Sequence, residues 1–513
     1  MGLVKQDTDE DTLDEALRTG AKIEELPSDD SDDDFEDVDD DDAVTKEETL
    51  LPLSQDDLPL YLREAVLGLF HTDLETTTTE AQAKTNDECL PYLLGQKTDG
   101  LPTNSHGLPA LRKTQHVAFL KAQVANLPAP YVAIDASRPW FFYWTMAGLS
   151  SLGEDVTSYR ERLMDTVKPL QNKTGGFGGG HGQFSHCAGT YATVLALACV
   201  DGLEVVDRKA MWEWLGSMKQ ADGGFRMAQG AEEDIRGAYC GMTVLALLNL
   251  PIELPPSAPA RKAGLKTFTD RLGEWVGRCQ TYEGGIGGAP TNEAHGAYAF
   301  CALACLSIID EPHASIPKYL DVTSLTHWLA ARQTPSEGGF QGRQEKLVDA
   351  CYSHWVGGCW DLLQAAIKGN KPPSVSSEVS ADGDGSSPDL WNRAALIRYL
   401  LTCCQQPGAK KSGMRDKPST RPDAYHTCYS LAGLSHAQNH YHYEGGNKGN
   451  APQTNGCPTA GFRWSASRPS EQEMQEWKFD EQDRVQFVHP VFVVPMKVVE
   501  KTRLQFESAR GGW

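Results

Sequence analysis

The sequence predicts an all-α protein in which pairs of helices close into an α/α toroid. A short frame recurs five times, a glycine cluster precedes each of the first four frames, and an apolar run follows each of the first three. The frames are HCAGTY (186–191), DIRGAY (234–239), EAHGAY (293–298), DACYSH (349–354) and DAYHTC (423–428). Self-similarity at this spacing is typical of stacked helical repeats.

Each repeat is predicted to contain an outer helix, a glycine turn and an inner helix. Small residues and leucines at three- and four-residue spacing predict buried inner helices in TVLALACV, CGMTVLALLNL and AFCALACLSII. Glycine clusters at 175–180, 222–225, 283–288 and 337–342 allow tight turns. The outer helices are expected at 211–219, 272–280 and 325–333. Because the inner helices are polar only near their starts, we expect a closed ring with its cavity at that end.

The chain has 513 residues and a net charge of −23, which is concentrated at its start. Residues 1–60 hold 23 acidic and 4 basic side chains and are predicted to be an acidic disordered tail. The DDFED stretch at 33–37 resembles a magnesium-binding DDxxD motif, but a near-homopolymer of aspartate produces that match by chance. The toroid domain is expected at 61–505, with inserted loops at about 369–388 and 445–467.

Composition excludes several other classes of protein. No apolar run reaches 18 residues, so we expect no integral membrane protein. The charged start is unlike a signal peptide, and the 13 cysteines lack CxxC spacing, which indicates free thiols and a cytoplasmic location. None of the glycine clusters has the phosphate-loop form GxxxxGK[ST]. We expect no nucleic-acid partner.

Equivalent positions of a repeat occupy equivalent places, so the third residues of the last four frames are expected to converge. These residues are Arg236, His295, Cys351 and Tyr425. Asp349, Cys351 and His426 are all good zinc ligands, and three ligands leave a fourth position open. Such an ion either activates water or holds a substrate thiol as thiolate. The alternative is a capping aspartate, a core cysteine and a buried histidine.

Cationic and aromatic side chains accompany the same frames. Arg236, His295, Arg343 and Lys346 suit a diphosphate, and Tyr352 and Tyr425 add hydroxyl groups. The aromatic side chains near the frames are Trp140, Trp144, Tyr191, Tyr239, Tyr298, Trp355 and Tyr429. Taken singly, the cations could be surface charges and the rings core residues. Together, a charged head and an apolar tail indicate an isoprenoid diphosphate.

Five segments carry a close family resemblance. RPWFFYW (138–144), EEDIRGAYC, EGGIGG with EAHGAYAFC, EGGFQGRQEKLVDACYSHW and DAYHTCYSLAGLS resemble the β subunits of protein farnesyltransferases, from roughly Leu111 to beyond Pro490. The resemblance implies a catalytic subunit that pairs with an α subunit and transfers a farnesyl group from farnesyl diphosphate to the cysteine of C-terminal CaaX motifs, by way of a zinc-bound thiolate.

The resemblance also assigns roles to individual residues. It places one zinc ion on Asp349, Cys351 and His426, and magnesium with the diphosphate near Asp416. It implies that the farnesyl diphosphate, with its isoprenoid chain, is bound by Arg236, His295, Gly296, Tyr298, Arg343, Lys346, Tyr352 and Trp355. Trp140, Trp144 and Tyr425 would line the CaaX pocket, with His186 near its last side chain. Trp140 and Tyr429 would limit the donor to C15.

The sequence departs from the family pattern at two positions, and three alternative functions remain open. Thr420 stands where family members carry a basic residue, and Gly189 replaces a proline near the CaaX exit. A geranylgeranyltransferase type I β subunit is the nearest rival, and Trp140, Tyr429 and Asp416 argue against it. A triterpene cyclase would need DxDD on a structured segment and QxxxGxW repeats. A non-catalytic helical-repeat binding protein would hold no zinc.

Overall fold

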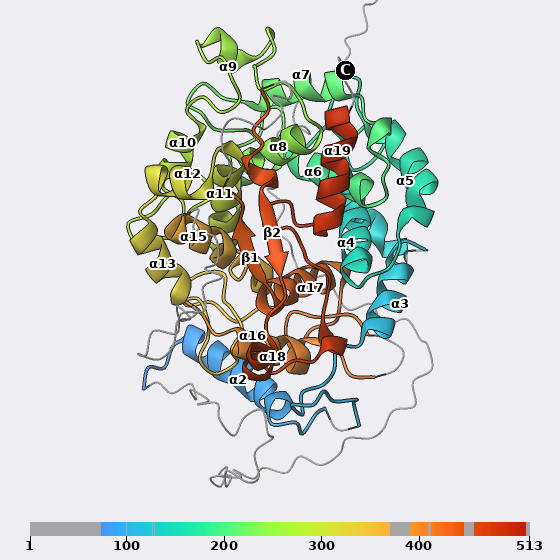
Figure 1. Ribbon diagram of the computed structural model, residues 1–513, viewed down its shortest axis with the longest axis vertical. Coiled ribbons are helices and arrows are strands. Elements are labelled where there is room, and N and C mark those ends of the chain that lie inside the picture. The colour runs from blue at the N-terminus through green and yellow to red at the C-terminus, as the bar shows by residue number, and fades with distance from the viewer. Residues whose placement is uncertain are drawn as a thin grey trace, which may run out of the picture. The chain divides into compact units, whose positions relative to one another are not determined.

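The computed structural model describes residues 73–98, 100–125, 127, 129–369, 390–408, 412–445 and 456–508. The predicted acidic tail (1–60) and residues 370–388 of the predicted first insertion lie outside the described residues. The helix and strand labels follow Figure 1.

The inner helices form a closed circuit (Figure 1). In chain order they are α4 (Arg138–Ser151), α6 (Cys187–Cys199), α8 (Ile235–Leu247), α11 (Gly296–Ile309), α14 (Tyr352–Trp355) and α17 (Ala424–Gln438). Each packs against the next, and α17 packs against α4, which closes the ring. Their side chains form one continuous buried core. The predicted α/α toroid is therefore confirmed.

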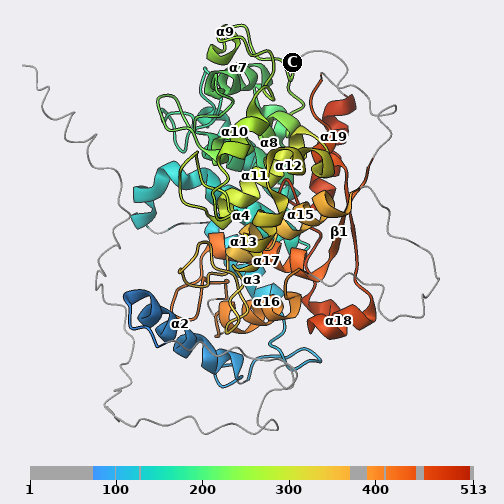
Figure 2. The same cartoon turned by 90° about the vertical axis from the view of Figure 1, so that its left-hand side faces the viewer.

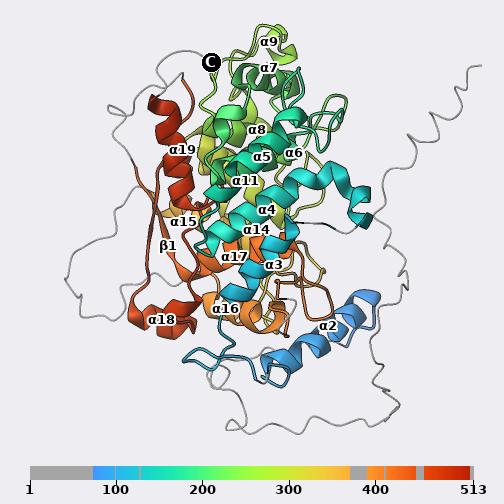
Figure 3. The same ribbon diagram turned by 90° about the vertical axis from the view of Figure 1, so that its right-hand side faces the viewer.

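The remaining helices surround or extend this ring. The three predicted outer helices are α7 (Arg208–Met218), α10 (Leu272–Arg278) and α13 (Val322–Ala330). The others are α2 (Thr77–Leu93), α3 (Lys113–Gln123), α5 (Arg160–Val167), α9 (Pro259–Lys262), α12 (Pro312–Tyr319), α15 (Cys359–Lys368), α16 (Arg393–Tyr399), α18 (Glu471–Trp477) and α19 (Met496–Ser508). Figure 3 shows α3 beside α4 and α5 beside α6, and these pairs are in contact.

The described part of the chain contains one small sheet. Strand β1 (His440–Tyr443) pairs antiparallel with β2 (Trp464–Ser467), and His440 faces Ser467 in the register. Figure 2 shows β1 lying beside α15, with which it is in contact. Residues 445–467 were predicted to be an inserted loop. Residues 446–455 lie outside the described residues, but Trp464–Ser467 is a strand rather than a loop.

The inner-helix starts share a hydrogen bond with the glycine turn that precedes them. The backbone N–H donates to the carbonyl nine residues earlier in each of five pairs: His186 to Phe177, Asp234 to Phe225, His295 to Ile286, Asp349 to Phe340, and Asp423 to Met414. The next N–H reaches the following repeat, as when Ala350 donates to the Asp416 carbonyl at 3.1 Å. This pattern fixes where each inner helix begins. The fifth turn, Ser412–Met414, has one glycine rather than two and was not predicted from the sequence.

This register corrects one prediction. His295 occupies the helix-capping slot shared by Asp234 and Asp349, two residues before the slot of Arg236 and Cys351. The EAHGAY frame was aligned with DIRGAY on its final Gly-Ala-Tyr, which is misplaced by two residues. The functional candidates therefore do not share one slot, because Arg236 and Cys351 lie two residues further along their repeats than His295 does. They still gather at one end of the ring because both slots lie at the starts of the inner helices.

Lys219 stands where the other turns carry glutamine. Gln171, Gln280 and Gln333 form the same isolated bridge to the turn as Lys219 does. The Lys219 side chain is fully buried, and its Nζ donates to the Gly223 carbonyl at 2.7 Å. Burial lowers the pKa of Lys219 to about 7. The folded state therefore holds a lysine whose charge it disfavours.

We expect Lys219→Gln to stabilise the protein at neutral pH by about 1–3 kcal/mol. Gln280 and Gln333 already donate to the matching carbonyls of Gly284 and Gly338, at 3.0 and 2.9 Å. Between pH 7 and the unfolded pKa of about 10.4, the unfolded chain binds more protons, so wild-type stability rises with pH. Thermal unfolding at pH 7 and pH 9.5 should show the advantage of the variant shrinking as pH rises. An advantage that is constant with pH would contradict this explanation.

Candidate metal centre

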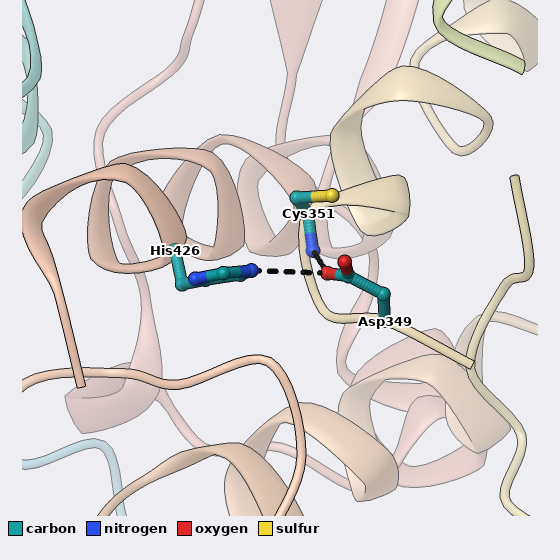
Figure 4. Close-up of side chains that lie close together, drawn as sticks. All are labelled: Asp349, Cys351 and His426. Carbon is teal, nitrogen blue, oxygen red and sulfur yellow. Dashed lines mark hydrogen bonds and ion pairs between the residues drawn. The ribbon is translucent and has the colours of Figure 1, made fainter. Parts of the chain in front are cut away.

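Asp349, Cys351 and His426 come together where α14 and α17 begin (Figure 4). One ligand atom from each lies within 4.8 Å of the others. Asp349 Oδ1 accepts a hydrogen bond from the Cys351 backbone N–H at 2.8 Å, and the same oxygen lies 3.3 Å from His426 Nε2. Among the described residues this is the one group of histidine, cysteine or carboxylate side chains with metal-ligand spacing.

Asp423 orients the His426 ring. Asp423 caps α17 by accepting from the His426 backbone N–H at 2.7 Å, and its second oxygen accepts from Nδ1 at 2.6 Å. A carboxylate behind a metal-binding histidine fixes the tautomer and directs the other nitrogen to the ion. His426 Nε2 is buried and, apart from the ion-pair contact with Asp349 at 3.3 Å, makes no hydrogen bond. Burial lowers the pKa of His426, but Asp349 and Asp423 outweigh burial and raise it to about 10.

The donor chemistry of this group fits zinc. Burial and the nearby Asp349 raise the pKa of the Cys351 thiol well above its usual value, so a thiolate needs a cation beside it. A divalent cation would replace the proton that His426 carries between two carboxylates. One carboxylate, one thiolate and one imidazole with an open fourth position is the pattern of catalytic rather than structural zinc.

We expect Asp423→Asn to weaken zinc binding by about 10- to 100-fold, because the imidazole loses its charged partner. Asparagine remains a good helix cap, so α17 should keep its start. Competition with a chromogenic chelator measures the zinc affinity. Asp321→Asn is the matched control, since Asp321 caps the outer helix α13 through the Ser324 N–H at 3.0 Å. Equal zinc affinity in Asp423→Asn and wild type would contradict the orienting role.

Asp416 lies in the loop beside the ligand group. Its carbonyl accepts from Ala350 N–H and from the Tyr399 hydroxyl. Burial, with the charge of Asp349, raises the pKa of the Asp416 carboxyl to about 6, although Lys417 opposes this. Lys417 forms an ion pair with one Asp416 oxygen, and the other oxygen has no hydrogen-bond partner. A cation at Asp416 would therefore have to displace the Lys417 ammonium or use the free oxygen.

The polar groups predicted for a diphosphate lie next to the metal ligands. Tyr352 Oη and His295 Nε2 are hydrogen-bonded at 3.2 Å. Burial lowers the pKa of His295 to about 4, and Arg343 and Arg236 add to this, so the ring is neutral at pH 7. The positive charges of both arginines therefore act on His295. Lys346 is exposed and lines a groove against α2 at the rim.

Both arginines are already paired with acids. Arg343 Nη1 lies 2.6 Å from a Glu293 oxygen, and Arg236 Nη2 lies 2.8 Å from an Asp234 oxygen. The Arg236 guanidinium also lies 5.5 Å from the centroid of the Tyr298 ring. Each guanidinium keeps free N–H groups, which can bind an anion without breaking its ion pair. Glu293 is the first residue of the EAHGAY frame, and its ion pair with Arg343 was not predicted from the sequence.

Apart from Tyr298, whose ring contacts His295, the predicted aromatic side chains form one cluster that reaches His426. Ring centroids are 5.5 Å apart for Trp140 and Trp144, which stack, 5.4 Å for Trp144 and Tyr425, and 4.9 Å for Tyr425 and Tyr429. Tyr425 lies 4.9 Å from the His426 ring and accepts a hydrogen bond from Trp355 Nε1 at 3.1 Å. These side chains form an aromatic wall that extends from the metal ligands into the toroid.

A toroid of this kind, with a metal-ligand group at the starts of its inner helices, fits a prenyltransferase of the α/α-toroid class. The family model described as "Prenyltransferase alpha-alpha toroid domain" matches residues 111–494. A solved structure, "Candida albicans protein geranylgeranyltransferase-I complexed with GGPP", matches with a TM-score of 0.54 and 18% identity, over 77% of this chain and 99% of that one. At that identity the likeness supports the fold alone.

Curated relatives narrow the class. Protein farnesyltransferase subunit beta of Pyricularia oryzae is 49% identical over 86% of this chain and 82% of its own length. The protein of the same name from Schizosaccharomyces pombe is 37% identical over 64% of this chain and 79% of its own. Geranylgeranyl transferase type-1 subunit beta of Arabidopsis thaliana is 25% identical over 65% and 87%. The chain belongs to the protein farnesyltransferase β-subunit family, which confirms the resemblance. Within the described residues, no helix is long and apolar enough to cross a membrane.

Proposed function

We propose that this chain catalyses transfer of a farnesyl group from farnesyl diphosphate to the cysteine thiol of a C-terminal CaaX motif, as the β subunit of a heterodimer with an α subunit. In this reaction a carbon–sulfur bond forms, the bond from C1 to the diphosphate oxygen breaks, the thiol proton goes to solvent and diphosphate leaves. The observation that carries the proposal is the Asp349, Cys351 and His426 group beside paired arginines and an aromatic wall.

The metal ligands and the polar groups are proposed to have separate roles, in thiol activation and in diphosphate binding. Zinc bound by Asp349, Cys351 and His426 would keep a substrate thiol deprotonated near neutral pH. Arg343, His295 and Tyr352 bind the diphosphate and stabilise the charge that develops on it as the bond to C1 breaks. Because His295 is neutral, it acts as a hydrogen-bonding group. Lys346 adds charge from the rim, and Arg236 adds charge near Tyr298.

Asp416 is the proposed carboxylate for magnesium on the diphosphate. If magnesium takes the Asp416 oxygen that pairs with Lys417, its binding is coupled to release of the lysine. The freed ammonium could then contact the diphosphate itself. Thr420 offers no charge in this loop; its hydroxyl donates to the Lys417 carbonyl at 3.0 Å.

The aromatic wall is proposed to hold the apolar parts of both substrates. Trp140, Trp144 and Tyr425 face the CaaX side chains, and Trp355 and Tyr429 bound the isoprenoid. All 13 cysteines are free and buried, in keeping with a reaction in the reducing cytoplasm. Geranylgeranyl transfer is the alternative, and the 25% identity to the type-1 subunit supports it less than the 49% match supports farnesyl transfer.

The function is tested by co-expressing the chain with an α subunit from a farnesyltransferase. The purified complex is assayed with C15 and C20 diphosphates on a CaaX peptide, and its zinc is measured by mass spectrometry. We expect one zinc per β subunit and a clear preference for the C15 donor. A complex that holds no zinc, or that transfers C20 in preference to C15, would overturn the proposal.

A further inference from the structure

Six aromatic rings close a layer across the inside of the toroid. In order they belong to Tyr143, Tyr191, Tyr239, Phe300, His354 and Tyr429, with successive centroids 5.9, 5.4, 5.8, 4.5 and 5.3 Å apart, and 6.4 Å from Tyr429 back to Tyr143. All six are at most 2% exposed. We call this set the floor layer. Tyr143 and Tyr239 donate from their hydroxyls to the carbonyls of Val493 and Val491, each at 2.8 Å, so the layer is sealed from behind.

His354 is the one imidazole of the floor layer, and it begins a buried polar chain. Its Nδ1 is hydrogen-bonded to His436 Nε2 at 3.2 Å, and His436 Nδ1 donates to an Asp361 oxygen at 2.6 Å. The two histidines are fully buried and Asp361 is 3% exposed. A polar chain in a hydrocarbon core costs free energy unless every member is paired, so it calls for a physical explanation.

The buried polar chain connects helices that carry the metal ligands. His354 is in α14, three residues after Cys351, and His436 is in α17, ten residues after His426. Asp361 is in α15, so three helical segments are tied together below the metal ligands. Burial lowers the pKa of His354 well below its usual value, so this ring is neutral and is oriented by a hydrogen bond.

The His354 end of this buried polar chain contacts Tyr429. The His354 and Tyr429 rings stack with centroids 5.3 Å apart and planes 20° apart, and Trp355 contacts the same tyrosine at 4.6 Å. A stacked ring is held in place only if its neighbour cannot rotate. The hydrogen bond between His354 and His436 limits rotation of the His354 ring, so it also limits movement of Tyr429 away from the pocket.

We propose that Asp361, His436 and His354 form a positioning chain that holds the floor layer rigid and thereby makes the pocket discriminate between C15 and C20 donors. This inference rests on the proposed function, because the donor is taken to lie above the floor layer. A longer isoprenoid fits only if a ring of the layer moves. The positioning chain raises the cost of that movement, whereas a ring held by packing alone could yield.

Two substitutions at His436 separate the hydrogen bond from the volume. His436→Leu removes the partner of His354 Nδ1, whereas His436→Gln can place an amide group near the position of Nε2. His354→Phe keeps a ring in the layer but removes the hydrogen bond, and it is the mildest change if a His436 variant does not fold. We measure dissociation constants for C15 and C20 diphosphates by tryptophan fluorescence of the zinc-loaded αβ complex, together with kcat and KM for both donors.

We expect His436→Leu and His354→Phe to lower the C15 to C20 preference about tenfold, the scale of one lost hydrogen bond. Zinc content should stay within about twofold of wild type in both variants, kcat with the C15 donor should do so in His436→Leu, and His436→Gln should retain the preference. His440→Leu is the control, because His440 contacts Glu473 and Trp477 rather than the floor layer.

Other outcomes would overturn the inference. They are an unchanged donor preference in both His436→Leu and His354→Phe, an equal loss in His436→Leu and His436→Gln, or a wild-type complex with no preference. A wild-type complex that binds both donors but transfers neither would refute the proposed function instead. In that case the ratio of dissociation constants still tests the positioning chain.

Discussion

Replacing Cys351 with alanine is expected to abolish zinc binding and prenyl transfer together. Cys351 Sγ is one of three ligand atoms, and Asp349 and His426 alone cannot complete a tetrahedral site. Without the ion nothing lowers the pKa of the substrate thiol, and several kcal/mol of catalysis are lost. We expect the rate at saturating peptide, measured in single-turnover assays, to fall by about 10³-fold or more. The zinc content should fall below about 0.1 ion per complex, because one of three ligands is lost.

The control is Cys199→Ala. Cys199 is a buried thiol at the far end of α6, so it shares the burial but not the ligand group. That variant should keep zinc and rate while losing some stability. Full zinc content and an undiminished rate in Cys351→Ala would rule out the ligand assignment. Loss of rate with full zinc content would instead leave the site structural and would require another group to activate the thiol.

Much of the fold could be predicted because each inner helix repeats a local signal. The Ala- and Leu-rich runs predicted the inner helices α6, α8 and α11, and the segments before the glycine turns predicted the outer helices α7, α10 and α13. The slot of His295 was misjudged because a Gly-Ala-Tyr match in letters is weaker evidence than the hydrogen bond from each helix start to the carbonyl nine residues earlier. The fifth turn was missed because Gly413 stands alone.

The candidate site was predictable where its residues share a frame. Asp349 and Cys351 lie two residues apart at one helix start, and His426 occupies the next repeat, so their meeting follows from the repeat. The ion pairs of Arg343 with Glu293 and of Lys417 with Asp416 depend on loop conformation, which no periodicity encodes. The hydrogen bond of His354 to His436 joins residues 82 apart and looks like core in the sequence.

Replacing Trp140 with threonine is expected to let the enzyme use a C20 donor. The Trp140 ring stacks on Trp144 at 5.5 Å and lies 6.0 Å from Tyr191, so it fills space beside the floor layer. Removing an indole frees room for several carbons, and each buried CH₂ is worth about 0.8 kcal/mol. We expect kcat/KM for the C20 donor to rise about 10- to 100-fold relative to C15. Trp212→Thr, on the outer helix α7, should leave the ratio unchanged.

Adding Tyr429→Phe tests whether the two side chains act as one wall. Both rings contact Tyr143, at 6.1 Å for Trp140 and 6.4 Å for Tyr429, so their effects are not independent. Tyr429→Phe removes only a hydroxyl, and alone it should change the donor ratio little. Once the indole is gone the ring can shift, so the double variant should favour C20 by more than the sum of the single effects. Strict additivity would mean that the two residues limit the pocket separately. A donor preference unchanged in all three variants would refute the assignment of pocket length to this wall.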